Sequence, residues 1–590
     1  MDFYGFYTGK SFDAYQYLGA HSEHGGVTFR TFAPLASRIS VIGEFNGWQE
    51  TPMQKAHDGN FWECHIENAA FGMMYKYRIY DRNGQCADHC DPYGHEMELR
   101  PNCASYICDL SYTFDDEDWM RSRSDCKTKP LNIYEIHFGS FKKPSKEPDG
   151  WHSYEEMADI LIPYVKENGY NYLEIMPLNE YPCDESWGYQ ATGFFAPTKR
   201  YGTAAQLKAF VNACHQNGIG VIMDFVPVHF AVDGYALAKY DGTALYEYPH
   251  EAVGVSEWGS CNFMHSRGEV RSFLQSAAEF WLSEFHMDGL RMDAISRAIY
   301  WQGCPERGVN VNAVEFLRQM NQGLKQRRPD AILVAEDSTS FQDATKPAIE
   351  HGLGFDYKWD MGWMNDTLDY FKNPPKRRIE EYHKLTFSMM YYYDERFLLP
   401  LSHDEVVHGK ATVLQKMYGL YDDKFLQAKA FYMYMYAHPG KKLNFMGNEI
   451  GHLREWDEKR EQDWNLLEYP AHKSFHQFMI RLNHFYLKHT AFFEKDYETS
   501  GFVWLDCHQE SKCIYAFERR SKTERIAAVF CFSDEKQPNY RLKIPDSKML
   551  TLLLSSRGEE ETGRIEPESE DGTYVLDLEP YSARYYEIHG

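Results

Sequence analysis

The stretch His286-Met287-Asp288-Gly289-Leu290-Arg291-Met292-Asp293-Ala294 is short and mostly apolar, and an arginine stands two residues before an aspartate near its end. In a β-strand, residues two apart point to the same face, so the pattern predicts that Arg291 and Asp293 face the same side. A guanidinium favours the ionised form of a neighbouring carboxyl group, and an ionised carboxylate at the end of a strand is a candidate nucleophile. A structural ion pair is the alternative interpretation, and the surrounding sequence must decide between them.

Around this stretch, apolar strand-like runs alternate with amphipathic helical patterns. The candidate strands lie at 132–137, 172–176, 220–225, 289–293, 332–336, 355–359, 397–401 and 442–446, and the helical patterns between them include 154–167, 204–216, 314–325 and 422–436. Eight strands with intervening helices predict an α/β fold, the (β/α)₈ TIM barrel. We place this catalytic barrel at 113–494, with an insertion after its third strand at about 230–265.

All-β sequence flanks the predicted barrel on both sides. Short alternating strands separated by turns predict a small β-sandwich within residues 1–112, and residues 495–590 are predicted to form a C-terminal β-sandwich domain. The stretches at 29–34 and 43–48 resemble the glycogen-binding-type module that precedes many α-glucan enzymes. Two roles of Trp48 are open, a platform for sugar and part of the core of this sandwich, and we expect the core.

Length, composition and charge exclude several classes of protein. A chain of 590 residues is long enough for more than one domain. Its net charge of −25 argues against a nucleic-acid partner, whose phosphates would be repelled, and no run reaches the roughly 20 apolar residues of a membrane span. No export signal opens the sequence, so we expect a cytoplasmic location with the 13 cysteines reduced.

One group of cysteines imitates a zinc ribbon. It consists of Cys86, Cys90, Cys103 and Cys108, with His89 among them. The spacings are looser than the usual CxxC, and residues 91–94 have the composition of a turn. We therefore expect no zinc here.

In a (β/α)₈ barrel the chemistry lies at the carboxyl ends of the strands. Polar residues occupy four of these predicted ends: Asp224 and His229 after the third strand, Arg291 and Asp293 at the fourth, Glu336 at the fifth, and His403 and Asp404 after the seventh. Acidic residues commonly cap helices, so one such residue alone would mean little. Four such ends on one face favour a catalytic site.

These four stretches resemble, in order, the four signature regions of the α-amylase family of glycoside hydrolases and transglycosylases. The wider sequence, above all 401–410 and 445–449, is similar to the 1,4-α-glucan branching enzymes of that family. The resemblance implies that Asp293 is the nucleophile, Glu336 the general acid/base and Asp404 the stabiliser of the transition state. It also implies a set of residues that hold the transferred sugar: Tyr189, Asp224, His229, Arg291 and His403.

The residue types suit that chemistry. A retaining mechanism needs two carboxyl groups about 5–5.5 Å apart, one to attack the anomeric carbon and one to protonate the leaving oxygen. We expect Arg291 to keep Asp293 ionised, and the neighbouring negative charge to favour the protonated form of Glu336. The position before His229 is Val228, where calcium-binding members of the family carry asparagine, so no metal is expected.

The resemblance implies an enzyme that cleaves α-1,4-glucan chains and transfers the fragment to a 6-hydroxyl, forming α-1,6 branches in glycogen-like polymers. No phosphate-cradling glycine loop is visible, so no nucleotide or redox cofactor is expected. Two alternatives stay open: a hydrolase with the same catalytic groups, and a glucan-binding protein that has lost catalysis. The oligomeric state also stays open.

Residues 296–308 look unlike the usual sequence of the family. We expect Trp301, just after the nucleophile strand, to bind the acceptor glucan as an aromatic platform. Other aromatic residues expected near the loop face of the barrel are Trp187, Trp258, Tyr300 and Trp363.

Overall fold

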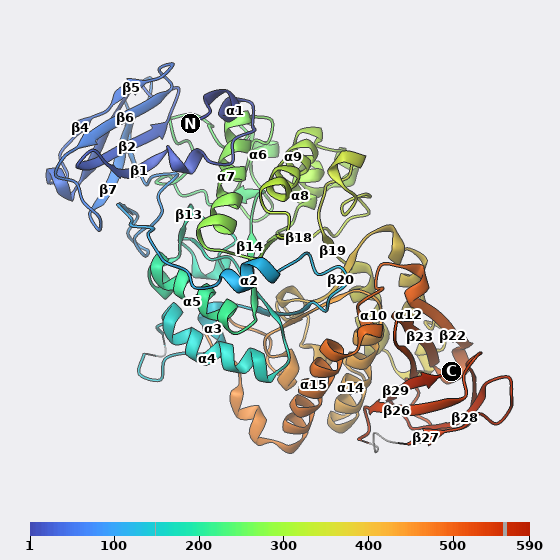
Figure 1. Cartoon of the computed structure of the whole chain (residues 1–590). Coiled ribbons are helices and arrows are strands. Elements are labelled where there is room, and N and C mark those ends of the chain that lie inside the picture. The colour runs from blue at the N-terminus through green and yellow to red at the C-terminus, as the bar shows by residue number, and fades with distance from the viewer. Residues whose placement is uncertain (148, 559–562) are drawn as a thin grey trace. The chain divides into compact units, whose positions relative to one another are not determined.

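The computed structural model describes residues 1–147, 149–558 and 563–590 (Figure 1). The chain divides into two compact units. The first comprises residues 1–125, 137–162 and 174–356, and the second comprises residues 126–136, 163–173 and 357–590.

The predicted barrel is confirmed. Its strands close in the order β10 (Asn132–Ile136), β11 (Tyr172–Ile175), β14 (Gly220–Phe225), β17 (Gly289–Met292), β18 (Ile332–Ala335), β19 (Tyr357–Trp359), β20 (Phe397–Leu401) and β21 (Lys441–Phe445). These are the eight predicted strands, with ends displaced by at most two residues.

The strand register aligns the carboxyl ends that carry the candidate site. Asp224 of β14 pairs with Arg291 of β17, and Met292 of β17 pairs with Ala335 of β18. Gly289 permits this close pairing, because a Cβ there would lie 2.3 Å from the carbonyl oxygen of Ile332. Three neighbouring strands of the first unit therefore end side by side.

Most of the predicted helices are also present. In the first unit, α5 (Ala204–Gln216) begins at a capping box of Thr203 and Gln206, and α9 (Val311–Arg327) contains the predicted 314–325. In the second unit, every residue of α14 (Tyr421–Ala437) from 430 to 437 is buried, which explains the run of aromatic residues and methionine at 431–436. The helix α4 (Tyr154–Glu167) has the predicted bounds.

The amino-terminal module is a β-sandwich with two main sheets. One has the order β1 (Gly19–Glu23), β2 (Gly26–Phe32), β6 (Phe61–Ile66), β5 (Gln54–Ala56), and the other β4 (Thr51–Pro52), β3 (Arg38–Gly43), β7 (Met74–Tyr80), β8 (Cys86–His89), with β9 (Ser105–Tyr106) paired to β7. The expectation that Trp48 is core was wrong. It is 38% exposed and has a φ of 62°, because it follows the turn at Gly47 that ends a short 3-10 helix.

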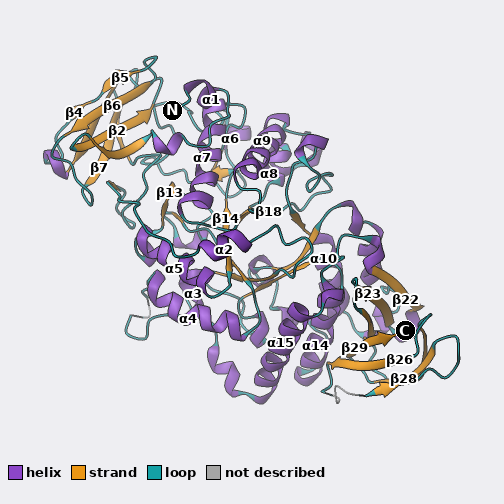
Figure 2. Ribbon diagram, in the orientation of Figure 1, coloured by secondary structure: helices purple, strands orange, loops and turns teal. Residues whose placement is uncertain are grey.

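The carboxyl-terminal domain is all-β, as predicted, and Figure 2 draws it almost entirely as strands and loops. A sheet has the order β22 (Phe502–Gln509), β23 (Ile514–Arg520), β24 (Arg525–Cys531), β29 (Ser582–His589), β26 (Met549–Ser555), β27 (Arg564–Ile565). A second sheet pairs β25 (Gln537–Lys543) with β28 (Thr573–Leu578). Their facing side chains form one apolar cluster that includes Val529, Leu542, Leu550, Leu576 and Tyr586.

Candidate active site

The candidate nucleophile follows β17 directly. The backbone N–H of Asp293 donates to the carbonyl of Phe225, 3.0 Å away, which fixes the residue against β14. The next residue, Ala294, has a φ of 44°, in the left-handed region that non-glycine residues seldom adopt. This strained turn presents the Ala294 N–H to Glu336 Oε2 at 3.0 Å.

Arg291 is the centre of the site. Its guanidinium is buried, with 1% of the side chain exposed. Nη1 donates to Asp293 Oδ1 at 3.0 Å and also binds Asp224 Oδ2, while Nη2 donates to Glu336 Oε2 at 2.7 Å. One cation thus contacts three carboxylates from three neighbouring strand ends, and the structure brings these four predicted residues together.

Tyr189 joins the same cluster from a loop. Its hydroxyl donates to Asp224 Oδ2 at 2.6 Å and accepts from Arg291 Nη1 at 3.3 Å. The preceding Gly188 has a φ of 95°, and a Cβ there would lie 2.7 Å from the carbonyl oxygen of Pro177. Glycine is therefore required for the turn that delivers Tyr189.

His229 lies on β15 (His229–Phe230), which pairs with β16 (Cys261–Asn262) in the predicted insertion. Burial lowers the pKa of His229 to about 4, so the imidazole is neutral at pH 7 and can donate or accept a hydrogen bond from a sugar hydroxyl. Its ring centroid is 5.2 Å from that of Trp258, which is 46% exposed. Trp258 is therefore a partly exposed aromatic residue beside His229, which is predicted to bind the sugar.

The expectation that Arg291 keeps Asp293 ionised was wrong. Burial raises the pKa of Asp293 well above its usual range, the neighbouring Glu336 adds to the rise, and Arg291 opposes it. The sequence suggested an Asp293 held ionised by Arg291, but that cation is divided among three carboxylates and its attraction is outweighed. Asp293 Oδ1 and Glu336 Oε2 both accept hydrogen bonds from the Arg291 guanidinium, so the two carboxyl groups lie close together.

The raised pKa makes a prediction about stability. A carboxyl group whose pKa is higher in the folded state stabilises the fold below its unfolded pKa, near 4, and this contribution is lost as the pH rises through the folded pKa. Asp293→Asn mimics the protonated form, so it should raise the free energy of unfolding at pH 7 by about 1 kcal/mol. Denaturant unfolding at pH 7 and pH 4 measures this. The gain should vanish at pH 4, and a gain that grows towards low pH would contradict the shift.

The second unit carries the remaining two polar strand-end residues. His403 and Asp404 follow β20, and His403 Nε2 lies 3.4 Å from Asp404 Oδ1. The other ring nitrogen of His403, Nδ1, is 2.5 Å from Oε1 of the buried Glu135 on β10. Glu135 also accepts from the hydroxyl of Ser402 at 2.9 Å and from the backbone of His403 at 3.3 Å.

Sequence reasoning did not identify Glu135. A carboxylate in this position fixes the tautomer of the imidazole, because Nδ1 must carry the proton that it donates. The available signal was an acidic residue inside an otherwise apolar barrel strand, in Ile133-Tyr134-Glu135-Ile136. A charged residue there needs a buried partner, which in this protein is 268 residues away in the sequence.

The loop after the nucleophile strand folds into short helical turns, α8 (Ser296–Ile299), η5 (Trp301–Gly303) and η6 (Pro305–Arg307). Trp301 is half-buried, with its ring edge-on to Tyr248 at 5.6 Å. Trp363 was expected at the loop face, but it is buried with 1% exposure in α10 (Met361–Lys372), so it packs in the core.

Two observations bear on metals. Val228 lies in a small buried cluster with Ala298 and Ala313, which offers no oxygen ligand from these side chains. Cys90 is buried against Met97, while Cys86 is exposed on β8. Within residues 1–147, 149–558 and 563–590, no group of three or more His, Cys, Asp or Glu is arranged to hold a metal ion.

Among the helices of those residues, none is long and apolar enough to cross a membrane.

Comparisons with known proteins agree with the architecture. Residues 148–241 and 258–525 match the alpha amylase catalytic domain, residues 17–94 match carbohydrate-binding module 48 (isoamylase N-terminal domain), and residues 504–589 match the alpha amylase C-terminal all-beta domain. Among solved structures, a pullulanase from Bacillus acidopullulyticus is 18% identical with a TM-score of 0.75, covering 97% of this chain and 74% of that one. At that identity the likeness concerns the fold.

Curated relatives are much more similar in sequence. The 1,4-alpha-glucan branching enzyme GlgB of Fusobacterium nucleatum subsp. nucleatum is 41% identical, covering 100% of this chain and 97% of the relative. The enzyme of the same name from Bacillus caldolyticus is 42% identical, covering 92% of this chain and 83% of the relative. That of Nitrosomonas europaea is 43% identical, covering 94% and 78%. The chain therefore belongs to the 1,4-alpha-glucan branching enzymes of the alpha-amylase family.

Proposed function

We propose that this protein is a retaining transglycosylase that cleaves α-1,4-glucan chains and transfers the fragment to a 6-hydroxyl, forming α-1,6 branches in glycogen-like polymers. The observation that carries the proposal is the buried Arg291, which contacts Asp293 and Glu336 at the ends of two neighbouring strands. Two carboxyl groups held by one guanidinium suit a retaining reaction, whereas an inverting enzyme needs about 6.5–9.5 Å between them to admit water.

The reaction assigns a different step to each carboxyl group. Asp293 attacks the anomeric carbon while Glu336 protonates the leaving glycosidic oxygen, and Glu336 then accepts the proton of the incoming 6-hydroxyl. The first step needs the proton on Glu336 and a negative charge on Asp293. The ionised Asp293 then stabilises the positive charge that develops on the sugar as the glycosidic oxygen leaves.

The surrounding polar groups hold the sugar. Tyr189, Asp224 and His229 provide a hydroxyl, a carboxylate and a neutral imidazole in the first unit. In the second unit, we assign Asp404 to transition-state stabilisation and His403 to a sugar hydroxyl, with Glu135 fixing the tautomer of the imidazole. Arg291 orients the carboxylates rather than transferring a proton.

Incubation with amylose tests the proposal. A branching enzyme creates α-1,6 branch points with few new reducing ends, a hydrolase creates reducing ends alone, and a binding protein creates neither. Isoamylase-released chain ends count the branches, and a reducing-sugar assay counts hydrolysis. A product without new branch points would overturn the proposed function.

The proposal also includes the domain bounds, the polymer partner and the cellular location. We retain 1–112, 113–494 and 495–590 as the domain bounds, and an α-1,4-glucan polymer as the partner. The 13 cysteines are free thiols, which supports a cytoplasmic location. The charge of −25 favours a neutral polymer over nucleic acid.

Transfer must compete with water at tens of molar, so the acceptor hydroxyl has to be held in place. Effective molarities of about 10⁵ M are available to well-oriented groups. We assign acceptor binding to Trp301. Trp301→Ala should therefore lower the ratio of branches formed to reducing ends released about threefold or more, since an aromatic platform contributes about 1 kcal/mol. The amylose assay gives this ratio directly.

Trp258→Ala is the matched comparison for Trp301→Ala. Trp258 adjoins His229, a predicted ligand of the transferred sugar, so its loss should slow branching and hydrolysis together and leave the ratio unchanged. If Trp301→Ala also leaves the ratio unchanged, the acceptor is bound elsewhere.

A further inference from the structure

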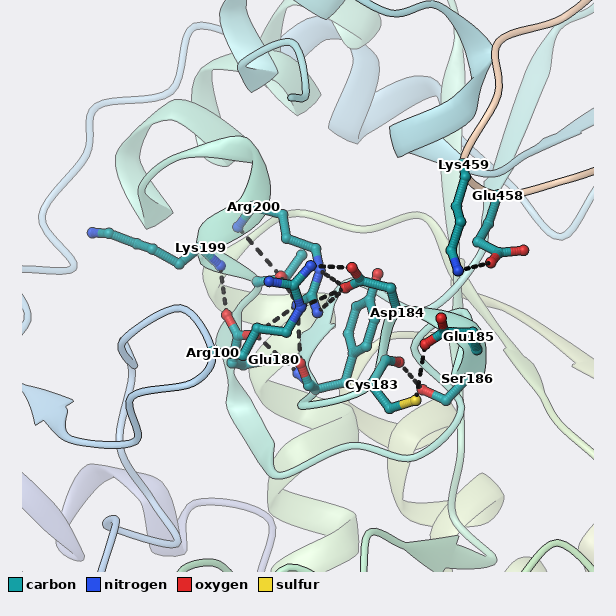
Figure 3. A network of polar contacts seen from close by, with 12 residues as sticks. Arg100, Glu180, Cys183, Asp184, Glu185, Ser186, Lys199, Arg200, Glu458 and Lys459 are labelled. Carbon is teal, nitrogen blue, oxygen red and sulfur yellow. Dashed lines mark hydrogen bonds and ion pairs between the residues drawn. The ribbon is translucent and has the colours of Figure 1, made fainter. Parts of the chain in front are cut away.

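The loop that delivers Tyr189 is anchored at Asp184 (Figure 3). Asp184 begins the short 3-10 helix η3 (Asp184–Ser186). The N–H of Trp187 donates to the carbonyl of Asp184 at 3.0 Å, and the N–H of Tyr189 donates to that of Ser186 at 2.9 Å. Consecutive hydrogen-bonded turns therefore connect the anchor to the catalytic tyrosine, so a displacement of Asp184 is passed on to Tyr189.

Two arginines bind the anchor, as the dashed lines of Figure 3 show. Arg200 follows β13 (Gly193–Pro197), and its Nε lies 3.0 Å from Asp184 Oδ1. Arg100 places its Nε 3.0 Å from the same oxygen and binds Oδ2 through Nη2. Burial alone would raise the pKa of Asp184, but the hydrogen bonds from both arginines outweigh it and lower the pKa. The anchor is therefore an ionised carboxylate held between two cations.

The two arginines have different surroundings. Arg200 is buried, with 1% of its side chain exposed, and its Nη1 also donates to Glu180 Oε1 at 2.8 Å and to the carbonyl of Tyr181 at 3.0 Å. Its removal would leave buried partners unsatisfied and would destabilise the fold. The side chain of Arg100 is 37% exposed and binds the edge of Asp184. An exposed ion pair contributes little to global stability, so the main effect of Arg100 is on the position of the loop.

Arg100 comes from the segment that follows the carbohydrate-binding module. The match to that module ends at residue 94, and Arg100 lies between β8 and β9. In the same segment, Glu96 forms an ion pair with the amine of Lys199, the neighbour of Arg200. The segment therefore binds Lys199 through Glu96 and Asp184 through Arg100, all within the first unit.

We propose that Arg100 is a positioning residue for glucan transfer: by binding Asp184, it holds the Tyr189 loop in register with Asp224 and so couples the segment after the carbohydrate-binding module to the active site. The inference rests on the proposed function. A catalytic group misplaced by about 1 Å can cost up to about 10²-fold in rate. Since Arg200 retains Asp184 in the absence of Arg100, the expected loss is smaller.

The test is a double-mutant cycle with amylose as substrate. Arg100→Ala should lower kcat/KM for branching about tenfold while leaving the melting temperature close to that of the unmodified protein. In a Tyr189→Phe background, where the hydroxyl that binds Asp224 is already absent, Arg100→Ala should cost less than about twofold. Arg100→Lys keeps the charge without the two-pronged contact, so it should restore part of the rate.

Arg78→Ala is the matched control. Arg78 binds Asp88 in the same two-pronged manner, at 2.7 and 2.9 Å, and 31% of its side chain is exposed. This pair joins β7, which carries Arg78, to β8, which carries Asp88, in the amino-terminal module. Substitution of Arg78 should leave kcat/KM unchanged.

Three results would overturn the inference: an unchanged kcat/KM for Arg100→Ala, an equal loss in both backgrounds, or an equal loss for Arg78→Ala. If Arg100→Ala does not fold, Arg100→Lys is compared in the two backgrounds by the same criterion. An unmodified protein that forms no branches would instead remove the proposed function, so the two failures are distinguishable.

Discussion

Asp293→Ala is expected to abolish both branching and hydrolysis of amylose, with a loss of about 10⁴-fold or more in kcat. In the proposed reaction the covalent glycosyl intermediate forms on Asp293, and we expect no other carboxyl group of the cluster to replace it. Asp224 is occupied by Tyr189 and Arg291, while Glu336 must supply the proton. Branch counting and the reducing-sugar assay measure the two activities separately.

The fold should survive this substitution. Asp293 is a buried carboxyl group with a raised pKa, so removing it also removes an unfavourable burial. The melting temperature should therefore not fall as the activity does. Asp118→Ala, on the exposed face of α2 (Glu117–Ser122), removes a carboxylate without touching the cluster and should keep full activity. Residual activity of more than a few per cent in Asp293→Ala would place the nucleophile elsewhere.

Glu336→Gln is expected to reduce branching of amylose by about 10²–10⁴-fold, the usual contribution of a general acid. Glutamine keeps the size and the contacts with Arg291 and the Ala294 N–H but cannot donate a proton to the glycosidic oxygen. Fluoride leaves a glucosyl fluoride without protonation by an acid, so this substrate should still form the covalent glycosyl intermediate. Mass spectrometry of the digested variant should find the sugar on the peptide that contains Asp293.

The double variant Asp293→Ala/Glu336→Gln is the control for that adduct. It should carry no sugar, because the attacking oxygen is absent. An adduct on another residue, or a glucosyl fluoride reaction as slow as that with amylose, would show that Glu336 is not the acid.

The barrel could be predicted because each of its strands is an apolar run bounded by turn residues. In the carboxyl-terminal domain the same signal predicts strands at 502–504, 514–517, 526–532, 549–554 and 574–578. It missed β25, where only Tyr540 and Leu542 are buried and the other side chains are half-exposed or exposed. β29 was also missed, because arginine, glutamate and histidine interrupt its apolar residues. β25 has too few buried positions to produce a recognisable alternation. β29 lies between β24 and β26 with most of its side chains buried, so its polar residue types, and not exposure, conceal it.

In the site, the spacing of nearby residues predicted their contact, but the sequence did not show which distant residues would meet. The two-residue interval between Arg291 and Asp293 predicted their contact. That Arg291 also binds Asp224 and Glu336 depends on the register of three strands. The pKa of Asp293 is raised because its burial, together with the neighbouring Glu336, outweighs the attraction of Arg291. Glu135 and Arg100 were missed for the same reason, since their partners lie 268 and 84 residues away in the sequence.

The three carboxylates around Arg291 also determine which inhibitors this protein should accept. Asp224, Asp293 and Glu336 surround a single guanidinium, so the acidic groups outnumber the cation three to one. A sugar mimic with a protonated ring nitrogen would find there the electrostatic partner that a neutral glucose unit finds only as its anomeric carbon becomes positive. A uronic acid at the same position would meet repulsion and lose its hydration shell at the same time.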